Sequence, residues 1–223
     1  MPQTENIKID IWGVEEIHIA PQPFNLMIVI AACEIVGAYL ACFCSGFLQE
    51  VTISFSLLCH VTLLFFFRGY LRNFKSRPVI LWMNCNIVVN CLLFLITGIA
   101  GFNLDSLFQK GDITARIIYL CLYLLSIVIA VIYGLKLRRI KNDPVGLLKE
   151  LGASLAFGIL VCELLIGALS FTGYATSLSR MKYYNETIQI MERTVYNIPP
   201  FIMILIFVRA ANYLKKEASG KLS

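Results

Sequence analysis

Six long apolar runs alternate with short polar connections along the chain. Each run has about 20 residues, which as an α-helix spans the ~30 Å hydrocarbon core of a bilayer. Transmembrane β-strands would instead show alternating polarity over stretches of about ten residues, and the sequence has none. The pattern predicts an all-α, polytopic integral membrane protein with six transmembrane helices, at residues 24–44, 51–71, 79–102, 114–137, 151–174 and 195–214.

The segments outside these spans are too short to form a second domain. Residues 1–23 are polar and lack the basic start and short apolar core of a secretory signal peptide, so we interpret them as a cytoplasmic tail. Residues 215–223 form a second, basic tail. In the last span Pro199 and Pro200 fall in the first turn, where a missing amide proton costs least, and Arg209 is expected to extend towards the nearby interface.

Basic residues cluster on every second connection. Lys and Arg prefer the cytoplasmic side of short loops, so this alternation predicts that both termini are cytoplasmic. Five of the 19 basic residues lie on the opposite side. The other fourteen are Lys8, Arg68, Arg72, Lys75, Arg77, Lys136, Arg138, Arg139, Lys141, Lys149, Arg209, Lys215, Lys216 and Lys221.

The longest external connection, residues 175–197, has helical periodicity. Its apolar residues recur at spacings of three and four, which is typical of one face of a helix. We expect an amphipathic helix that lies on the outer membrane surface or caps the bundle and ends at the proline pair. The apolar positions are Leu178, Met181, Tyr184, Ile188, Met191 and Val195.

Composition narrows the function classes. Hydrophobic residues make up 58% of the 223 and charged residues 15%, against about a quarter charged in soluble domains. Six spans leave no room for a separate soluble catalytic or nucleic-acid-binding domain. The net charge of +5 comes from the basic residues of the loops and tails, which the membrane topology explains, so no nucleic-acid partner is expected.

Three ionisable side chains lie near the middle of predicted spans: Glu34, His60 and Glu163. Such groups are costly in hydrocarbon and usually face the bundle interior. Asn90 lies at a similar depth in the third span, one turn after Asn86. The sequence therefore predicts a substrate or ion site at the midplane formed by Glu34, His60, Asn90 and Glu163.

Three interpretations of this group remain open. The first is a proton- or cation-handling site, in which a carboxyl group and a histidine titrate. In the second, protonated glutamates and asparagines hydrogen-bond neighbouring helices, and His60 alone would bind a backbone carbonyl or an asparagine. The third is a metal bound by one His and two carboxylates, but no ligand-spacing motif is present, and we predict neither metal nor cofactor.

Small residues share a helical face with each buried glutamate. Ala31, Gly37 and Ala41 lie on the face of Glu34, so this part of the chain can approach another helix closely. The corresponding face of Glu163 carries Gly152, Ala156, Gly167 and Ser170.

Other candidate features are less specific. All eight cysteines fall within predicted spans without a CxxC pair, which favours a packing role. Asn185 starts an N-glycosylation sequon on the predicted external side. Arg138, Arg139 and Lys141 form a juxtamembrane cluster that would attract anionic lipid, although topology alone also demands basic residues there.

Three function classes follow. The first is a small transporter or channel with the polar midplane site, and the second is a non-catalytic membrane subunit, assembly factor or adaptor that binds a membrane-protein partner through its helix faces. The third, a lipid-modifying membrane enzyme, has the least support, because the polar groups lie below headgroup depth and no nucleophile, base and orienting group stand together.

Overall fold

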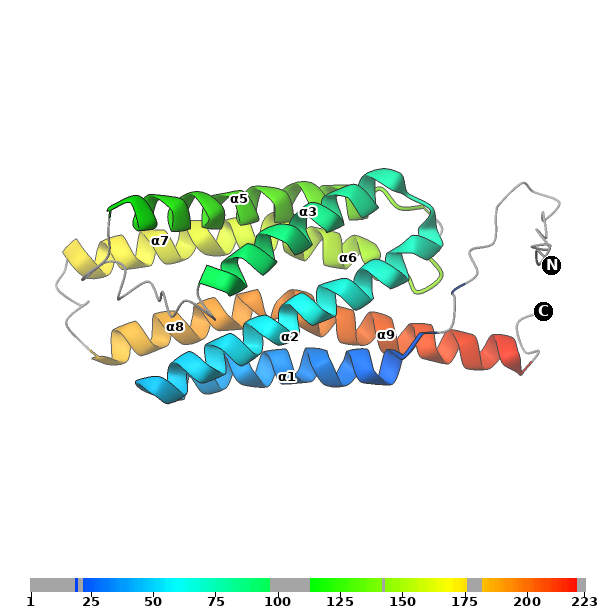
Figure 1. The fold of residues 1–223 in the computed structure, drawn as a ribbon, viewed down its shortest axis with the longest axis horizontal. Helices are drawn as coiled ribbons and strands as arrows, with labels where there is room; N and C mark the ends of the chain where they lie inside the picture. The colour runs from blue at the N-terminus through cyan, green and yellow to red at the C-terminus, as the bar shows by residue number, and fades with distance from the viewer. Residues whose placement is uncertain (1–18, 20–21, 97–112, 142, 176–181, 220–223) are drawn as a thin grey trace.

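The computed structural model describes residues 19, 22–96, 113–141, 143–175 and 182–219, and in this part of the chain every regular element is helical (Figure 1). The elements are α1 (Phe24–Phe43), α2 (Phe47–Leu71), the short 3₁₀ helix η1 (Arg72–Phe74), α3 (Arg77–Phe94), α5 (Ile113–Leu137), α6 (Leu148–Ala153), the π-helical segment η3 (Ser154–Gly158), α7 (Ile159–Ala175), α8 (Lys182–Tyr196) and α9 (Ile198–Ala218).

Six helical segments are long and apolar enough to cross a membrane, as the sequence predicts. The second starts four residues earlier than expected, and the sixth extends to Ala218 because two lysines are accommodated in its last turn. The fifth is the continuous run of α6, η3 and α7. Helix α3 ends at Phe94, and the last residues of the predicted third span, 97–102, lie outside the described part.

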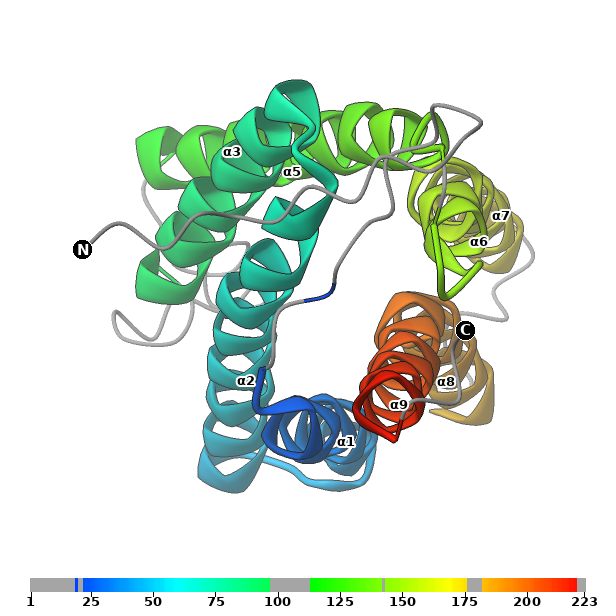
Figure 2. The ribbon, with the colours of Figure 1, turned by 90° about the vertical axis from the view of Figure 1, so that its right-hand side faces the viewer.

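The six spans form a ring, seen end-on in Figure 2. Neighbours in sequence are neighbours in space, from α1 through α2, α3 and α5 to α6–η3–α7, and α9 closes the ring against α1. Helix α1 begins and α9 ends at the same end of the bundle, where the α2–α3 turn and the α5–α6 loop also lie (Figure 1). The basic connections thus gather at one end, as the charge pattern predicts.

The outer surface of the ring is apolar. Soluble monomers rarely expose large contiguous apolar patches, whereas a surface that faces lipid must be apolar. The fold is therefore compatible with an integral multi-pass membrane protein. Exposed side chains on the six spans include Val36, Phe65, Leu81, Leu120, Leu164 and Leu205.

The predicted amphipathic helix is present as α8, but it does not lie across the end of the bundle. It runs along the long axis and leads almost directly into α9 (Figure 1). The Tyr184 hydroxyl donates to the Leu169 carbonyl of α7 at 2.6 Å, and the Tyr39 hydroxyl of α1 donates to Thr194 Oγ1 at 3.0 Å. These bonds tie α8 lengthwise against two spans. Its position outside the membrane stays a prediction.

Two glycines bring α5 and α6 into backbone contact. A Cβ atom on Gly134 would lie 2.6 Å from the Gly152 carbonyl oxygen, and one on Gly152 would lie 2.5 Å from that of Gly134. Ala156, in η3, belongs to the same contact. The close approach expected at Gly152 and Ala156 is therefore confirmed.

The same small-residue face does not continue along α7 as predicted. Gly167 is exposed, and a Cβ atom there would meet nothing within 4 Å. The buried side of this helix runs instead through Leu151, Leu155, Ile159 and Cys162, and it does not include Gly167. The prediction is therefore wrong for Gly167, and the side chains of Glu163 and Ser170 lie outside the described part.

The α5–α6 loop is fastened by Asp143. Its Oδ1 accepts the Val145 amide at 3.0 Å, and its Oδ2 accepts the amide of Leu148, the first residue of α6, at 2.8 Å. Arg209, which was expected to extend towards the interface, donates from its guanidinium to the Val145 carbonyl at 3.1 Å. The side chain thereby links the last span to this loop.

Asp143→Ala is expected to lower the free energy of unfolding by about 1–2 kcal/mol, because two amides lose their acceptor at once. Thermal unfolding of the purified protein in a mild detergent measures the change. Asp143→Asn keeps one acceptor oxygen and should lose less. An Asp143→Ala protein that unfolds at the wild-type temperature would show that the loop does not depend on these bonds.

Candidate functional site

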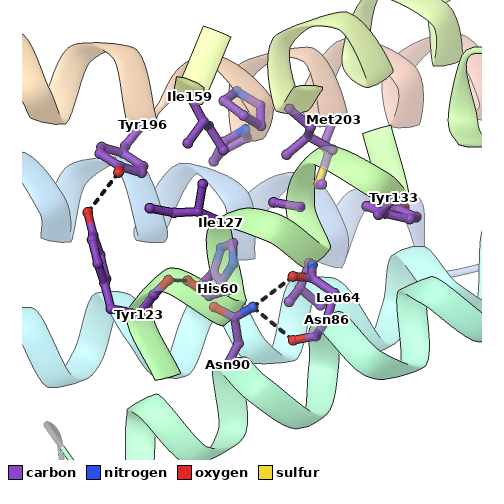
Figure 3. Close-up of a pocket in the computed structure, with 15 residues that line it drawn as sticks. His60, Leu64, Asn86, Asn90, Tyr123, Ile127, Tyr133, Ile159, Tyr196 and Met203 are labelled. Atoms are coloured by element: carbon purple, nitrogen blue, oxygen red, sulfur yellow. Dashed lines mark hydrogen bonds between the residues drawn. The ribbon is translucent and has the colours of Figure 1, made fainter. Parts of the chain in front are cut away.

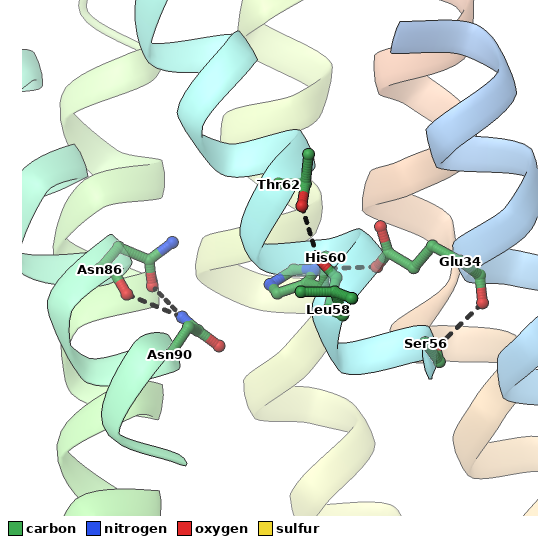
Figure 4. Close-up of polar contacts among 7 residues, drawn as sticks. All are labelled: Glu34, Ser56, Leu58, His60, Thr62, Asn86 and Asn90. Carbon is green, nitrogen blue, oxygen red and sulfur yellow. Dashed lines mark hydrogen bonds and ion pairs between the residues drawn. The ribbon is translucent and has the colours of Figure 1, made fainter. Parts of the chain in front are cut away.

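Glu34 of α1 and His60 of α2 form a direct pair in the interior of the bundle. His60 Nδ1 lies 2.7 Å from Glu34 Oε1, and Glu34 is only 6% exposed (Figure 4). The Ser56 hydroxyl of α2 donates to the Glu34 backbone carbonyl at 3.0 Å. The sequence predicts a common depth for the two ionisable groups, and the structure places them in contact rather than pairing His60 with a backbone carbonyl or an asparagine.

Small residues make this contact possible. Ala31, Gly37 and Ala41 are buried on the face of α1 that carries Glu34. A Cβ atom on Gly37 would lie 3.2 Å from Ser56 Cβ, so α1 and α2 approach closely at this level. The predicted close packing on the Glu34 face is confirmed, and it brings the carboxyl group within reach of α2.

The imidazole of His60 lies between Glu34 on one side and an asparagine pair of α3 on the other (Figure 4). Asn90 Nδ2 donates to the Asn86 backbone carbonyl at 2.8 Å and to Asn86 Oδ1 at 3.1 Å. Both asparagines are thus oriented by each other, one turn apart. Three of the four predicted site residues, Glu34, His60 and Asn90, come from three spans and gather at one level.

His60 and both asparagines line a cavity of about 130 Å³ inside the ring (Figure 3). A space of this size holds several water molecules, because one needs roughly 10–15 Å³ measured in the same way. No Lys, Arg, Asp or Glu is among its described lining residues. The remaining lining residues are Leu64, Tyr123, Ser126, Ile127, Ala130, Tyr133, Leu155, Ile159, Tyr196, Pro199, Pro200 and Met203.

Tyrosines from α5 and α8 complete the polar lining. The hydroxyls of Tyr123 and Tyr196 are 3.0 Å apart and hydrogen-bonded to each other (Figure 3). Tyr133 lines the cavity nearer the C-terminal end of α5. Ser126, which also lines the cavity, donates to the Tyr123 carbonyl at 2.7 Å. Sequence analysis missed these residues, because a tyrosine in an apolar helix is equally typical of the membrane interface.

Two buried oxygen atoms at this site have no hydrogen-bond partner within the described residues, namely Glu34 Oε2 and the Tyr133 hydroxyl. Buried polar groups are nearly always paired, because an unpaired one costs about 1–3 kcal/mol. Hydrogen-bond partners for these atoms therefore lie outside the described protein groups, and water is the usual one.

Glu163, the fourth predicted residue, lies in α7, four residues after Ile159 of the cavity lining. Its side chain falls outside the described part, so its place in the site stays a prediction. The same holds for the side chain of Asn185, whose backbone is in α8.

The described residues form neither a metal-binding cluster nor a disulfide bond. The described residues contain no cluster of three or more His, Cys, Asp or Glu side chains that could hold a metal ion. All eight cysteines are free thiols, and seven of them are at least partly buried.

The cavity wall is mostly apolar, and His60 presents its imidazole to it among a small number of polar groups. With Glu34 ionised, His60 Nδ1–H donates to it, which leaves the second ring nitrogen as an acceptor on the asparagine side. Comparison of this chain with family models, curated proteins and solved structures finds no match.

Proposed function

We propose that the protein is a small transporter or channel for protons or small cations, with Glu34, His60 and Asn90 at its central site. The observation that carries the proposal is the 2.7 Å contact between Glu34 and His60, together with the place of His60 on the wall of the central cavity. Ionisable groups inside a membrane bundle typically mark proton relays and ion pathways.

In this proposal His60 takes up and releases the proton. Glu34 holds one ring nitrogen, so the ring keeps its orientation and a proton arriving from the cavity binds the other nitrogen. A histidine changes charge within the physiological range more readily than other side chains. Uptake and release on the cavity side would therefore require only small changes in geometry.

The asparagines and tyrosines supply the neutral part of the path. Amides and hydroxyls can both donate and accept hydrogen bonds, so they can orient a short chain of water molecules or replace part of the hydration shell of a cation. Asn90, which is held by Asn86, is the nearest such residue on α3. The phenols of Tyr123 and Tyr196 extend the polar wall to α8.

The cavity also favours transport over the adaptor role. An adaptor that binds a partner through its outer helix faces gains nothing from polar groups around a central space, and filling that space with apolar side chains would stabilise it. A Glu–His pair that served only to join α1 to α2 would need no such space beside the imidazole.

Flux across reconstituted vesicles tests the proposal. The full chain in liposomes, with a pH-sensitive dye or a cation indicator inside, should give a flux that changes between about pH 5 and 8. Glu34→Gln keeps the size of the side chain and removes its charge, and should reduce the flux by about a hundredfold. Glu163→Gln should also reduce it if that side chain joins the site.

The matched control is Glu150→Gln, which makes the same change at an exposed position on α6. It should leave the flux unchanged. Glu34→Gln protein that folds, inserts and retains full flux would contradict the proposal.

A further inference from the structure

Two basic loops that are far apart in sequence meet around the start of α3. The pocket between them measures about 370 Å³ and lies at the end of the bundle where α1 begins and α9 ends. One wall comes from the α2–α3 turn and the first residues of α3, and the other from the last turn of α5 and the residues that follow it. Its lining residues are Phe74, Ser76, Pro78, Val79, Lys136, Arg139, Ile140 and Lys141.

Positive charge in this pocket is not compensated by the described residues. Lys136, Arg139 and Lys141 line it, and no carboxylate does. Asp143, the next acidic residue along the loop, is not part of the lining, and its oxygens accept from the amides of Val145 and Leu148. Three cations therefore converge on one concave site that suits an anion.

The basic residues that line the pocket differ from the cluster Arg138, Arg139 and Lys141 expected from the sequence. Arg138 lies over the ring of Phe157 in η3, with its guanidinium carbon 5.2 Å from the ring centroid. A Cβ atom on Gly152 would lie 2.8 Å from Arg138 Cγ, so the stem of this side chain passes beside Gly152. Arg138 is thus directed to the α6–η3 side, and Lys136, one turn before Ile140, takes its place in the pocket.

A second basic groove adjoins the pocket across Pro78. It combines Arg72, Lys75 and Arg77 with Leu81 and Trp82 of α3. Tryptophan is typical of the headgroup level of a membrane, and cations beside it can contact lipid phosphates. The apolar residues Leu81, Val88 and Leu92 continue as an exposed face along α3, beside which an acyl chain can lie.

Ser76 adds a hydroxyl to the pocket. It occupies the N-cap position of α3, but its side chain makes no capping hydrogen bond. A hydroxyl that is not engaged by the helix can donate to a phosphate oxygen, alongside the charge-assisted bonds from lysine and arginine.

We propose that this pocket binds the headgroup of an anionic phospholipid that carries a phosphomonoester. Three cations exceed what a phosphodiester with one negative charge can balance, whereas a phosphomonoester brings up to two charges and three acceptor oxygens. Arg139 forms the bidentate contact that a guanidinium makes with phosphate, and Lys136 and Lys141 act as point charges. The acyl chains lie along α3.

Lipid binding to the purified full chain tests this inference. Native mass spectrometry in a neutral detergent counts bound molecules of phosphatidic acid, of phosphatidylglycerol as the diester comparison, and of inorganic phosphate as the free-anion comparison. Phosphatidic acid should bind most tightly. Arg139→Gln/Lys141→Gln should weaken its binding by about 25-fold, since each basic residue near the headgroup contributes about a factor of five.

Two controls each remove one positive charge outside the pocket, Lys149→Gln on the exposed surface of α6 and Arg138→Gln beside Phe157, and the two are also combined in one variant so that the total change of charge matches. All three variants should bind phosphatidic acid like the wild type. Equal loss in a control and in the double variant would overturn the pocket in favour of general surface charge. Equal binding of phosphatidic acid and phosphatidylglycerol would contradict the preference for a phosphomonoester. Displacement of phosphatidic acid by inorganic phosphate would show that the pocket binds the free anion and not a lipid.

Discussion

Gly134→Ala is expected to lower the free energy of unfolding by about 3 kcal/mol or more, enough to prevent stable folding in detergent. The added methyl group would lie 2.6 Å from the Gly152 carbonyl oxygen and 2.8 Å from the Ala156 backbone nitrogen. Neither atom belongs to a flexible side chain that can turn away. Helix α5 would have to separate from α6 and η3, which would break the ring between its fourth and fifth spans.

Gly167→Ala provides the matched control. The same substitution there meets nothing within 4 Å, so it should be neutral or stabilise the helix by up to about 1 kcal/mol. Thermal unfolding of both variants in the same detergent measures the difference. Similar unfolding temperatures for Gly134→Ala and Gly167→Ala would mean that the α5–α6 contact is looser than described.

His60→Leu is expected to destabilise the protein by about 3 kcal/mol, because it leaves the buried Glu34 carboxyl group without its partner. Oε1 would lose the 2.7 Å contact, and Oε2 already has no hydrogen-bond partner within the described residues. The loss should appear as a lower unfolding temperature and a lower yield of membrane-inserted protein.

Removing both partners should restore stability. In Glu34→Leu/His60→Leu no ionisable group is left buried at this level, and replacing a buried ion pair by apolar side chains is often neutral or stabilising. The double variant should therefore unfold near the wild-type temperature. If it is as unstable as His60→Leu, the destabilisation comes from packing and not from the unpaired carboxyl group.

Hydropathy and charge were sufficient to predict the spans and the gathering of basic loops at one end, because the transfer of side chains into hydrocarbon determines both. The depth of Glu34 and His60 followed from their positions within their runs. The contact between the two side chains could not be predicted in this way, because it depends on how α1 is rotated about its axis relative to α2. The buried face of Ala31, Gly37 and Ala41 indicates that rotation only once the partner helix is known.

Other features depend on three-dimensional context that periodicity does not contain. Spacing alone placed Gly167 on the packed face of its helix, but the buried side runs through Leu155, Ile159 and Cys162 and leaves Gly167 exposed. Arg138 and Arg139 are adjacent and chemically identical, yet one covers Phe157 and the other lines the basic pocket. The helical periodicity of α8 was correct, but its course along the bundle depends on tyrosine contacts with other helices.

The most direct test of the account is proton or cation flux through the Glu34→Leu/His60→Leu protein in liposomes, compared with the wild type at equal amounts of inserted protein. If Glu34 and His60 form the transport site, the double variant folds and inserts like the wild type but carries no pH-dependent flux. Wild-type flux in this variant would contradict the account and would show that the pair serves only to join α1 to α2.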